Sequence, residues 1–494
     1  MEDKLAKLPR GWAWTEIGNI GEIITGTTPS KSINEYYGKD FPFYKPTDLN
    51  EGYYVRKSED GLSKKGINKG RLLPAKSILV TCIGATIGKT GFIRKAGASN
   101  QQINAIIPKR GVVPEYIFFS CISPQIQKSI INNASSTTLP ILNKTKFEKL
   151  SIPIPPFPEQ NRIVFKIEEL FAKLDAGVEA LKKVKAQLKR YRQAVLKYAF
   201  EGKLTQEWRE ANKDKLEPAS VLLERIKEER KKDAKGKFKE LSPLDTSDLS
   251  ELPEGWAWTR VGDIGNVLGG KRVPKGHDYS ETPTNHPYIR VTDFENHSIN
   301  MSNLVFLKPE THKIIQKYTI SKKDVYISIA GSIGKVGVIP QRLNGANLTE
   351  NAAKITDMME VGNKYLSYAL NSAFSQEQIS RLTISTNQPK LALFRIEQII
   401  IPLASTIEQQ KVVEEIEIRL SMADEVEKVA EQTLTQSDRL RQSILKQAFE
   451  GKLIPQDPTD EPAEKLLERI KAEKAEKGTE TKIRRKRSNE MELK

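Results

Sequence analysis

The most constraining feature of this sequence is an internal repeat that runs through nearly its whole length. Residues 8–15 return as residues 252–259 with one difference, 244 positions later. Further along each copy, residues 192–204 agree with residues 441–453 at 10 of 13 positions. Self-similarity at a fixed spacing is the signature of a duplicated architecture. The 494 residues are therefore expected to form two copies of one module, each able to bury its own core.

Both copies have the same order of parts. A region with short apolar runs and Gly, Pro and Asn turns comes first, and runs such as residues 77–83 and 325–329 predict buried strands. A proline-containing exit follows, and then 42 residues without proline (159–200 and 408–449), which predict a helix about 60 Å long. The predicted parts are a first α/β domain at 1–155, a long helix with a short helix after it at 156–227, a linker at 228–250, a second α/β domain at 251–403, a second long helix with a short helix after it at 404–475, and a disordered basic tail at 476–494.

The two long helices carry apolar residues at heptad spacing, which is typical of coiled coils. The expected seam of the first helix, interrupted by Gly177, consists of Ile167, Leu170, Leu174, Leu181, Val184, Leu188, Tyr191, Val195 and Tyr198. The expected seam of the second helix, where Arg419 and Gln447 intrude, consists of Ile416, Ala423, Val426, Ala430, Leu440 and Ile444. Small residues in the second helix would let the larger ones of the first approach closely. We therefore expect the two helices to pack against each other rather than each within its own module.

Charge indicates a polyanionic partner. The chain has 79 basic and 63 acidic residues, a formal net charge of +16. Residues 1–155 hold 22 basic and 12 acidic side chains, whereas residues 251–403 hold 17 and 14. Such an excess favours binding to nucleic acid or to another anionic surface. Solubility through net charge is the alternative interpretation.

Membrane and secretory classes are excluded by simple counts. No run of about 18 apolar residues occurs, so no membrane span is expected. The charged start lacks the apolar segment of a signal peptide. Cys82 and Cys121 are the only cysteines, which excludes a disulfide framework. These features predict a cytoplasmic protein.

Two segments resemble known catalytic or phosphate-binding motifs, but each lacks a feature that the motif requires. Residues 84–90 resemble a phosphate-binding loop, but one residue too few separates the two glycines, and a Gly-rich turn between two strands is expected instead. Residues 154–157 resemble the Pro-Pro-aromatic loop of adenine methyltransferases, but Ile154 cannot accept a hydrogen bond from the target amine, so a rigid hinge is expected. The four histidines show no metal-ligand spacing, and the first module has none. The sequence therefore predicts a binding protein without catalytic residues, metal or cofactor.

These motifs together resemble the specificity subunits of type I restriction–modification enzymes. The resemblance rests on the repeated Leu-Pro-x-Gly-Trp-x-Trp openings, the Gly-rich turns followed by Asn104 and Asn351, the exit at residues 152–155, the Glu-Gln pair before each long helix and the Ala-Phe-x-Gly-Lys-Leu ending. It covers nearly the whole chain. One departure is the second exit, residues 401–404, which lacks the usual second proline and leaves the hinge geometry of the second module open.

The resemblance implies two α/β target-recognition domains, separated by an antiparallel pair of long coiled-coil-like helices. Each domain of such a subunit reads one half of a bipartite, asymmetric DNA sequence, and the helices set the gap and bind two modification (methyltransferase) subunits. Those subunits methylate adenine with S-adenosylmethionine, and restriction subunits join them for ATP- and magnesium-dependent translocation and cleavage. The specificity subunit itself would bind no cofactor and catalyse nothing.

Candidate DNA contacts are polar side chains on loops, since Arg and Lys suit guanine, and Asn and Gln suit adenine. In the first module they are Thr27, Thr28, Ser30, Lys31, Lys89, Asn100, Gln101, Gln102, Ser136 and Thr137. In the second module they are Lys271, Arg272, Lys335, Asn347, Thr386, Asn387, Gln388 and Lys390. A solvated or turn-capping role is the alternative for each. Tyrosines interleaved with Lys and Arg at residues 36–57 are typical of phosphate-contacting surfaces, although aromatic residues more often lie in the core.

Two rival functions remain open from the sequence. A self-contained DNA adenine methyltransferase would bind S-adenosylmethionine, which calorimetry on the isolated chain would detect. A sequence-indifferent DNA-bridging protein would also be basic and carry a coiled coil, but it would not protect a defined bipartite site in footprinting. The sequence does not reveal which bases are read, which adenines are methylated, or whether the isolated chain is monomeric.

Overall fold

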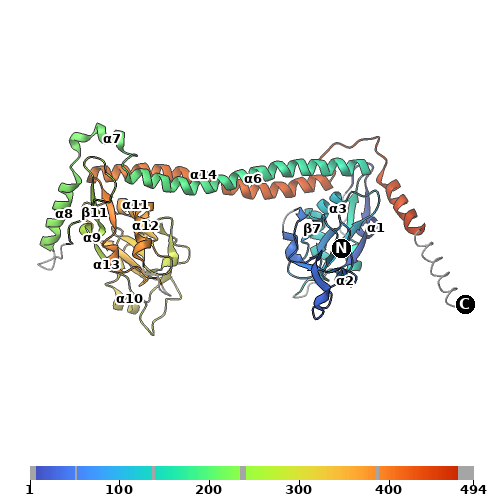
Figure 1. Cartoon of the computed structure of the whole chain (residues 1–494), viewed down its shortest axis with the longest axis horizontal. Helices are drawn as coiled ribbons and strands as arrows, with labels where there is room; N and C mark the ends of the chain where they lie inside the picture. The colour runs from blue at the N-terminus through green and yellow to red at the C-terminus, as the bar shows by residue number, and fades with distance from the viewer. Residues whose placement is uncertain (1–6, 51–52, 136–138, 234–240, 384–388, 477–494) are drawn as a thin grey trace. The chain divides into compact units, whose positions relative to one another are not determined.

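The computed structural model describes residues 7–50, 53–135, 139–233, 241–383 and 389–476 (Figure 1). The chain gathers into two compact units. Unit 1 comprises residues 1–181 and 431–494, and unit 2 comprises residues 182–430. Each of the two long helices therefore begins in one unit and ends in the other. Unit 1 is therefore built from two separate stretches of chain, whereas unit 2 is one continuous stretch.

Unit 1 contains the first globular domain, in which helices cover mixed sheets. The strand order is β2-β9-β6-β7-β4 in a five-stranded sheet, β5-β3-β8 in a three-stranded sheet and β1-β10 in a two-stranded one. The strands are β1 (Ala13–Glu16), β2 (Gly21–Thr25), β3 (Tyr37–Tyr44), β4 (Tyr54–Val55), β5 (Asp60–Leu62), β6 (Ile78–Thr81), β7 (Thr90–Ile93), β8 (Ala98–Ser99), β9 (Ile103–Pro108) and β10 (Ser151–Ile154). The short helices are α1 (Ile17–Ile20), α2 (Lys64–Ile67), α3 (Pro114–Cys121), α4 (Pro124–Asn133) and α5 (Lys144–Glu148).

Unit 2 contains the second globular domain, with a related but not identical set of sheets. The strand orders are β12-β21-β18-β19, β16-β13-β20-β17, β14-β15 and β11-β22. The strands are β11 (Ala257–Arg260), β12 (Asn266–Gly269), β13 (Pro287–Ile289), β14 (Phe294–Glu295), β15 (Ser298–Ile299), β16 (Val305–Phe306), β17 (Thr319–Ile320), β18 (Val325–Ser328), β19 (Val336–Val338), β20 (Ala346–Leu348), β21 (Ala352–Thr356) and β22 (Ile400–Leu403). The helices other than the long pair are α7 (Gln206–Ala211), α8 (Ala219–Asp233), α9 (Val261–Ile264), α10 (Pro309–Ile315), α11 (Asn363–Asn371), α12 (Ala373–Leu382) and α13 (Leu393–Ile396).

The predicted buried strands are present. Residues 77–83 contain β6 and residues 325–329 contain β18, and every residue of both strands is buried. Both lie inside a sheet with an antiparallel partner on each side. Continuous apolar runs of this length are typical of strands whose two faces are both covered.

The exit of each domain is a strand of a two-stranded sheet. Ala13 pairs with Ile154 in unit 1, and Ala257 pairs with Leu403 in unit 2, in the same antiparallel register. Prolines are tolerated there because an edge strand leaves one side of its backbone unpaired. The missing second proline in the second module, Ala404, therefore does not change the strand geometry.

The long helices are α6 (Phe157–Phe200) and α14 (Thr406–Phe449), each beginning two residues earlier than predicted and ending where predicted. Each stops before a glycine in the left-handed conformation, Gly202 (φ +69°) and Gly451 (φ +68°). A glycine just past the last turn adopts this conformation without steric cost and ends the helix.

The end of each long helix completes the core of the domain in the other module. In unit 2, Phe200 of α6 is buried and lies edge-to-face against Tyr365 of α11, with ring centroids 5.3 Å apart. In unit 1, Phe449 of α14 meets Tyr116 of α3 at 5.2 Å. The helices that follow are also attached, since the Ala219 N–H donates to the Gly255 carbonyl (2.8 Å) and the equivalent donor in unit 1, Ala463, bonds to Gly11 (2.9 Å). In both units, the opening motif of one module is thus attached to the segment that follows the long helix of the other module.

The two long helices pack together, as predicted, and run antiparallel in each unit (Figure 1). In unit 2, Lys185 pairs with Glu427 (3.9 Å), whereas Arg192, further along α6, pairs with Asp424 (2.6 Å), which is earlier in α14. In unit 1, Arg441 pairs with Asp175. Ionic contacts of this kind fix the register of paired helices.

The packing seam of α14 differs from the predicted one. Buried residues recur every seven positions, at Ile416, Ala423, Ala430, Ser437 and Ile444. Between each buried residue and the next, the residue four positions after the first and three positions before the second is half-buried. Val426 and Leu440, expected in the seam, are therefore 48% and 49% exposed, and Glu427 and Arg441 take the inner positions.

The seam of α6 is closer to expectation. Ile167 and Val195 are buried, and Leu170, Leu174, Leu181, Val184 and Leu188 are half-buried. Tyr191 and Tyr198 were expected in the seam but are exposed, because the same four-then-three step places Arg192 inward. Gly177 likewise lies outside the seam, and Val178 replaces it.

Candidate nucleic-acid interface

Three loops of unit 1 meet at the ends of β2, β6 and β9. The loop after β2 is bonded to the segment between β8 and β9, because the Thr27 N–H donates to the Ser99 carbonyl (2.9 Å) and the Gly26 N–H donates to the Ile103 carbonyl (3.0 Å). A side chain on Gly26 would have its Cβ 2.1 Å from the Asn100 carbonyl oxygen, so only glycine allows this contact. Residues 27–31, 83–89 and 100–102 are called the first loop cluster.

Side chains join the same two loops. The Thr28 hydroxyl donates to Gln101 Oε1 at 2.5 Å, across 73 residues of sequence. Asn100 is 8% exposed and donates through Nδ2 to Gln102 Oε1 at 2.9 Å, while its own Oδ1 accepts the Gln102 N–H at 3.2 Å. Asn100 therefore shapes the loop, and the exposed Gln101 is the amide of this cluster that points to solvent.

The Gly-rich segment is a turn between two antiparallel strands, as expected, and not a phosphate-binding loop. It joins β6 to β7, and both Gly84 (φ +103°) and Gly88 (φ +87°) have left-handed backbone conformations. Gln127 of α4 holds the turn by donating to the Gly88 carbonyl (2.9 Å) and to the Cys121 carbonyl (2.6 Å). Sequence reasoning missed Gln127.

Unit 2 repeats this framework. The Lys271 N–H donates to the Leu348 carbonyl (2.8 Å) and the Gly270 N–H to the Ala352 carbonyl (3.0 Å). A Cβ on Gly270 would lie 2.1 Å from the Thr349 carbonyl oxygen, the same close approach as in unit 1. We call residues 271–276, 330–335 and 349–351 the second loop cluster.

The turn of the second cluster is held in the same way. Gln376 of α12 donates to the Gly334 carbonyl (3.0 Å) and to the Leu370 carbonyl (2.8 Å). Gln127 and Gln376 each stand four residues after an N-cap serine, Ser123 and Ser372. Extending the repeat alignment through these helices would have found both glutamines.

A guanidinium–carboxylate pair stands in the second cluster where Thr28 and Gln101 stand in the first. Arg272 Nε donates to Glu350 Oε1 at 2.6 Å. Partial burial opposes the charged form of Glu350, but hydrogen bonds from Arg272 and Thr349 outweigh it and lower the pKa of Glu350 below its ordinary value. The Arg272 side chain is 78% exposed. Glu350 was not among the residues expected from the sequence.

The remaining candidates divide by exposure. The exposed ones are Ser30, Lys31, Lys271, Lys335 and Lys390, and the half-buried ones are Thr27, Lys89 and Gln102. Asn347 is fully buried, and its amide group bonds to His312 Nδ1 (2.7 Å) and to the Ile315 carbonyl (2.9 Å). The expectation that Asn347 contacts a base is therefore wrong, because both of its polar atoms are used inside the domain.

Five further candidates lie outside the described residues. They are Ser136, Thr137, Thr386, Asn387 and Gln388. The segments that flank them are attached to the Gly-rich turns, since Ile83 bridges to Ile141 in unit 1 and Ala330 bridges to Lys390 in unit 2.

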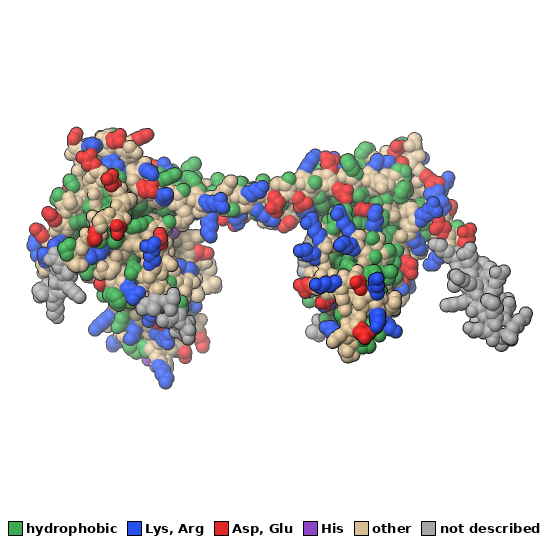
Figure 2. Space-filling model, viewed as in Figure 1, with side chains coloured by type: hydrophobic (Ala, Val, Ile, Leu, Met, Phe, Trp, Pro, Cys, Tyr) green, Lys and Arg blue, Asp and Glu red, His purple; other side chains and the backbone are tan. Residues whose placement is uncertain are grey.

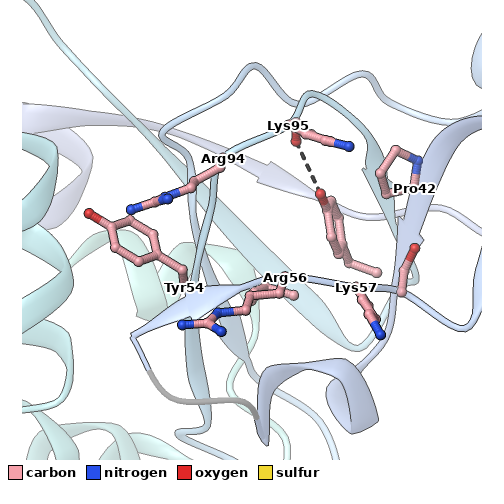
Figure 3. Close-up of a pocket in the computed structure, with 9 residues that line it drawn as sticks. Pro42, Tyr54, Arg56, Lys57, Arg94 and Lys95 are labelled. Carbon is pink, nitrogen blue, oxygen red and sulfur yellow. Dashed lines mark hydrogen bonds between the residues drawn. The ribbon is translucent and has the colours of Figure 1, made fainter.

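A basic pocket of about 400 Å³ opens in unit 1 where Arg94 and Lys95 follow β7 (Figure 3). Arg94 lies over the Tyr54 ring, with its guanidinium carbon 3.5 Å from the ring centroid. Figure 3 shows Arg94 and Lys95 on one side of the opening and Arg56 and Lys57 on the other. Within the described ranges none of these four cations has an ion-pair partner. Cations that lack a carboxylate partner and stand beside an aromatic ring suit a phosphate group.

The pocket is joined to the first loop cluster through Tyr44. The Tyr44 carbonyl accepts the Asn100 N–H (3.1 Å), while its hydroxyl donates to the Lys95 carbonyl (3.1 Å). Burial raises the pKa of Tyr44 to about 12, with a smaller contribution from Asp48, so the hydroxyl remains a donor at neutral pH. Of the cations in the tyrosine–lysine pattern, Arg56 and Lys57 line this pocket, whereas Lys45 pairs with Asp60 and Tyr44 belongs to the core. Contact of this surface with phosphate stays a prediction.

The equivalents of Arg94 and Lys95 in unit 2 are uncharged. The Lys89 and Lys335 carbonyls accept equivalent bonds from Thr81 and Ser328. Pro340 and Gln341 therefore occupy the positions that follow β19 as Arg94 and Lys95 follow β7. Figure 2 shows the many Lys and Arg side chains on the visible face of the first globular domain.

The described residues offer little for catalysis. Burial raises the pKa of both the Cys82 and the Cys121 thiol to about 12, so neither is a thiolate nucleophile at neutral pH. No group of three or more His, Cys, Asp or Glu side chains in the described part of the chain is arranged to hold a metal ion. Among the same residues, no helix is long and apolar enough to cross a membrane.

Comparison with known proteins agrees with the duplicated architecture. The family model for the type I restriction modification DNA specificity domain matches residues 9–190 and again residues 253–435. The EcoBI specificity subunit of Escherichia coli is 28% identical over 98% of this chain and 94% of its own length. The HsdS subunit from Thermoanaerobacter tengcongensis has a similar fold, with a TM-score of 0.55 at 17% identity over 92% of this chain and all of that one. A chain solved in a study of type I R-M complex assembly has a TM-score of 0.63 at 18% identity over 91% of this chain and all of that one.

Proposed function

The chain belongs to the type I restriction modification DNA specificity family, and we propose that it is the DNA-recognition subunit of such a system, with one half of a bipartite, asymmetric target read by each loop cluster. The observation that carries this proposal is the repeated loop framework with different side chains on it. Gly26 and Gly270 make the same backbone contacts, yet Thr28 and Gln101 in one cluster correspond to Arg272 and Glu350 in the other. Identical scaffolds with different polar groups suit two half-sites of different sequence.

The proposed role of the helix pair is to set the gap between half-sites and to dock partner subunits. Helices of 44 residues are about 66 Å long, about twice one turn of DNA. They expose apolar side chains that neither globular domain covers, including Phe165 (71%), Met422 (63%) and Val429 (57%). Partner subunits that bind along the helices would cover such side chains.

The partners proposed from family membership are double-stranded DNA, two modification subunits and the restriction subunits of the system. S-adenosylmethionine, ATP and magnesium would be bound by those partners, which place the methyl group on adenine and cleave the DNA. The chain would act in the cytoplasm, where the DNA and these subunits are found.

The test is selection of binding sites from random DNA by the full chain assembled with its modification subunits. The proposal predicts an enriched motif of two specified blocks with an unspecified gap of fixed length between them. A single block, or no enrichment despite tight binding, would favour a sequence-indifferent bridging protein instead.

The basic pocket provides a second prediction. Substitution of Arg94 by Ala should weaken binding to every DNA sequence alike and lower the slope of log affinity against log salt by about 0.9, because one phosphate contact is lost. Filter binding or anisotropy from 50 to 300 mM salt measures that slope. The matched control is Arg342→Ala, an exposed arginine just past the equivalent place in unit 2, which should leave the slope unchanged. A loss confined to one DNA sequence would contradict the phosphate role.

A further inference from the structure

The two loop clusters carry different side chains at two equivalent positions, which are 28 and 101 in unit 1 and 272 and 350 in unit 2. Position 28 lies two residues after Gly26, and position 272 lies two residues after Gly270, in loops fixed by the same backbone hydrogen bonds. Positions 101 and 350 follow the strands β8 and β20, each of which pairs in parallel with its neighbour, β3 or β13. The side chains at these positions meet in both units, as Thr28 with Gln101 and Arg272 with Glu350.

We propose that these two pairs read different base pairs at equivalent places in the two half-sites. The Thr28–Gln101 pair reads A·T, and the Arg272–Glu350 pair reads G·C. This inference rests on the proposed function, because it names the base pair that each reader selects.

Gln101 is the reading residue in the first cluster. A glutamine amide reads adenine by donating to N7 and accepting from the N6 amino group. The Thr28 hydroxyl donates to Gln101 Oε1 and thereby fixes which end of the amide is the acceptor. In the part of the chain that the structure describes, no other bond uses this amide, so the second lone pair of Oε1 and both Nε2 hydrogens remain for the base. Gln101 is exposed, whereas Thr28 is half-buried, so Thr28 is the positioning residue.

Arg272 is the reading residue in the second cluster, where the roles of the two loops are exchanged. Arginine reads guanine by donating from two nitrogens to O6 and N7. Glu350 accepts from Nε at 2.6 Å, which leaves the terminal nitrogens for the base. Glu350 is itself held by the Thr349 hydroxyl at 3.0 Å, and its carboxyl stays ionised because its pKa is lowered. The Arg272 side chain is 78% exposed, and Glu350 is the residue that positions it.

A purely structural ion pair does not explain this arrangement as well. The loops are already tied by backbone hydrogen bonds at Gly270 and Lys271. An exposed ion pair adds little to stability. A phosphate-contacting arginine would also gain nothing from a neighbouring carboxylate, because the negative charge opposes the approach of a phosphate.

The experiment exchanges the pairs in the full chain assembled with its modification subunits. One protein carries T28R with Q101E, and the other carries R272T with E350Q. Each selects from random DNA, and the enriched motifs are compared with that of the unaltered protein. In the first protein one A·T position of one half-site should become G·C. In the second protein one G·C position of the other half-site should become A·T, with the preference changed about tenfold or more.

Single variants separate reading from positioning. E350A should lower the guanine preference, and E350Q should restore most of it, since the glutamine oxygen still accepts from Arg272 Nε. A structural role would change stability in both variants and the base preference in neither. The control R225T with E360Q removes the exposed ion pairs of Arg225 with Glu360 (2.6 Å) and with Glu217 (2.8 Å), which lie outside the loop clusters, and should leave the motif unchanged.

The outcomes distinguish this inference from the proposed function. If the unaltered protein enriches no bipartite motif, the proposed function itself fails. If it does, but both exchanged proteins retain the original bases, the reading roles of Gln101 and Arg272 are wrong. The unaltered positions within the exchanged half-site report that the altered domain is folded, so a misfolded variant is not mistaken for a change in reading.

Discussion

Replacing Glu408 by Gln should destabilise unit 2 by about 3 kcal/mol, because it leaves a buried guanidinium without its anion. Glu408 is 1% exposed at the start of α14. It accepts hydrogen bonds from Arg209 Nε (2.8 Å), the Thr205 hydroxyl (2.7 Å) and Trp256 Nε1 (2.8 Å). The network joins the loop after α6, the opening motif of the second module and the first turn of α14. Its loss should therefore open the joint between helix and domain.

Unit 1 supplies the matched control, Glu159→Gln. Glu159 is also 1% exposed, but Ile454 and Pro458 stand where unit 2 has Thr205 and Arg209. Among the described residues Glu159 Oε1 has no hydrogen-bond partner, and burial raises the pKa of Glu159. Removing this carboxylate should leave the stability of unit 1 unchanged or slightly higher.

Hydrogen exchange in denaturant measures the two units separately, since a chain with two units does not unfold in one step. Glu408→Gln should lower the protection of β18 and β22 in unit 2 and spare β6 in unit 1. Equal effects of Glu408→Gln and Glu159→Gln on their own units would contradict the role given to Arg209.

Much of the architecture follows from the sequence because it depends on local patterns. The repeat predicted two modules, and uninterrupted proline-free stretches predicted α6 and α14 to within two residues at their starts. The apolar runs predicted β6 and β18. In each case the residues involved are neighbours in the chain, so their spacing carries the information.

What the sequence did not reveal depends on contacts between distant residues. The apolar end of α6 does not indicate which core it enters, so the crossing of helix ends between modules was not foreseen. The heptad pattern did not fix the helical phase, and Val426 and Leu440 were therefore placed in a seam from which they are absent. From the sequence alone Asn347 was expected to contact a base, whereas in the structure its amide group bonds to His312 and to the Ile315 carbonyl. Glu350 was not a candidate from the sequence, because its role depends on its contact with Arg272.

The second large expected effect concerns the length of the helix pair. Duplicating residues 182–188 in α6 and residues 431–437 in α14 adds one heptad to each helix. A heptad keeps the packing seam nearly in phase. Each helix should lengthen by about 10 Å, which corresponds to about three base pairs of DNA. The loop clusters that read the half-sites are untouched by either insertion.

A control insertion tests whether added length alone has an effect. Seven residues placed in the segment 241–250, which the structure describes as neither helix nor strand, lengthen the chain but not the helix pair. The protein with this insertion should select the original motif with its original gap.

The most direct measurement is therefore the gap in the DNA motif selected by the protein with the lengthened helix pair. A motif with both half-sites unchanged and a gap longer by up to about three base pairs is the predicted result. Enrichment of the original gap by the lengthened protein would contradict the claim that these helices hold two readers at a set distance along DNA.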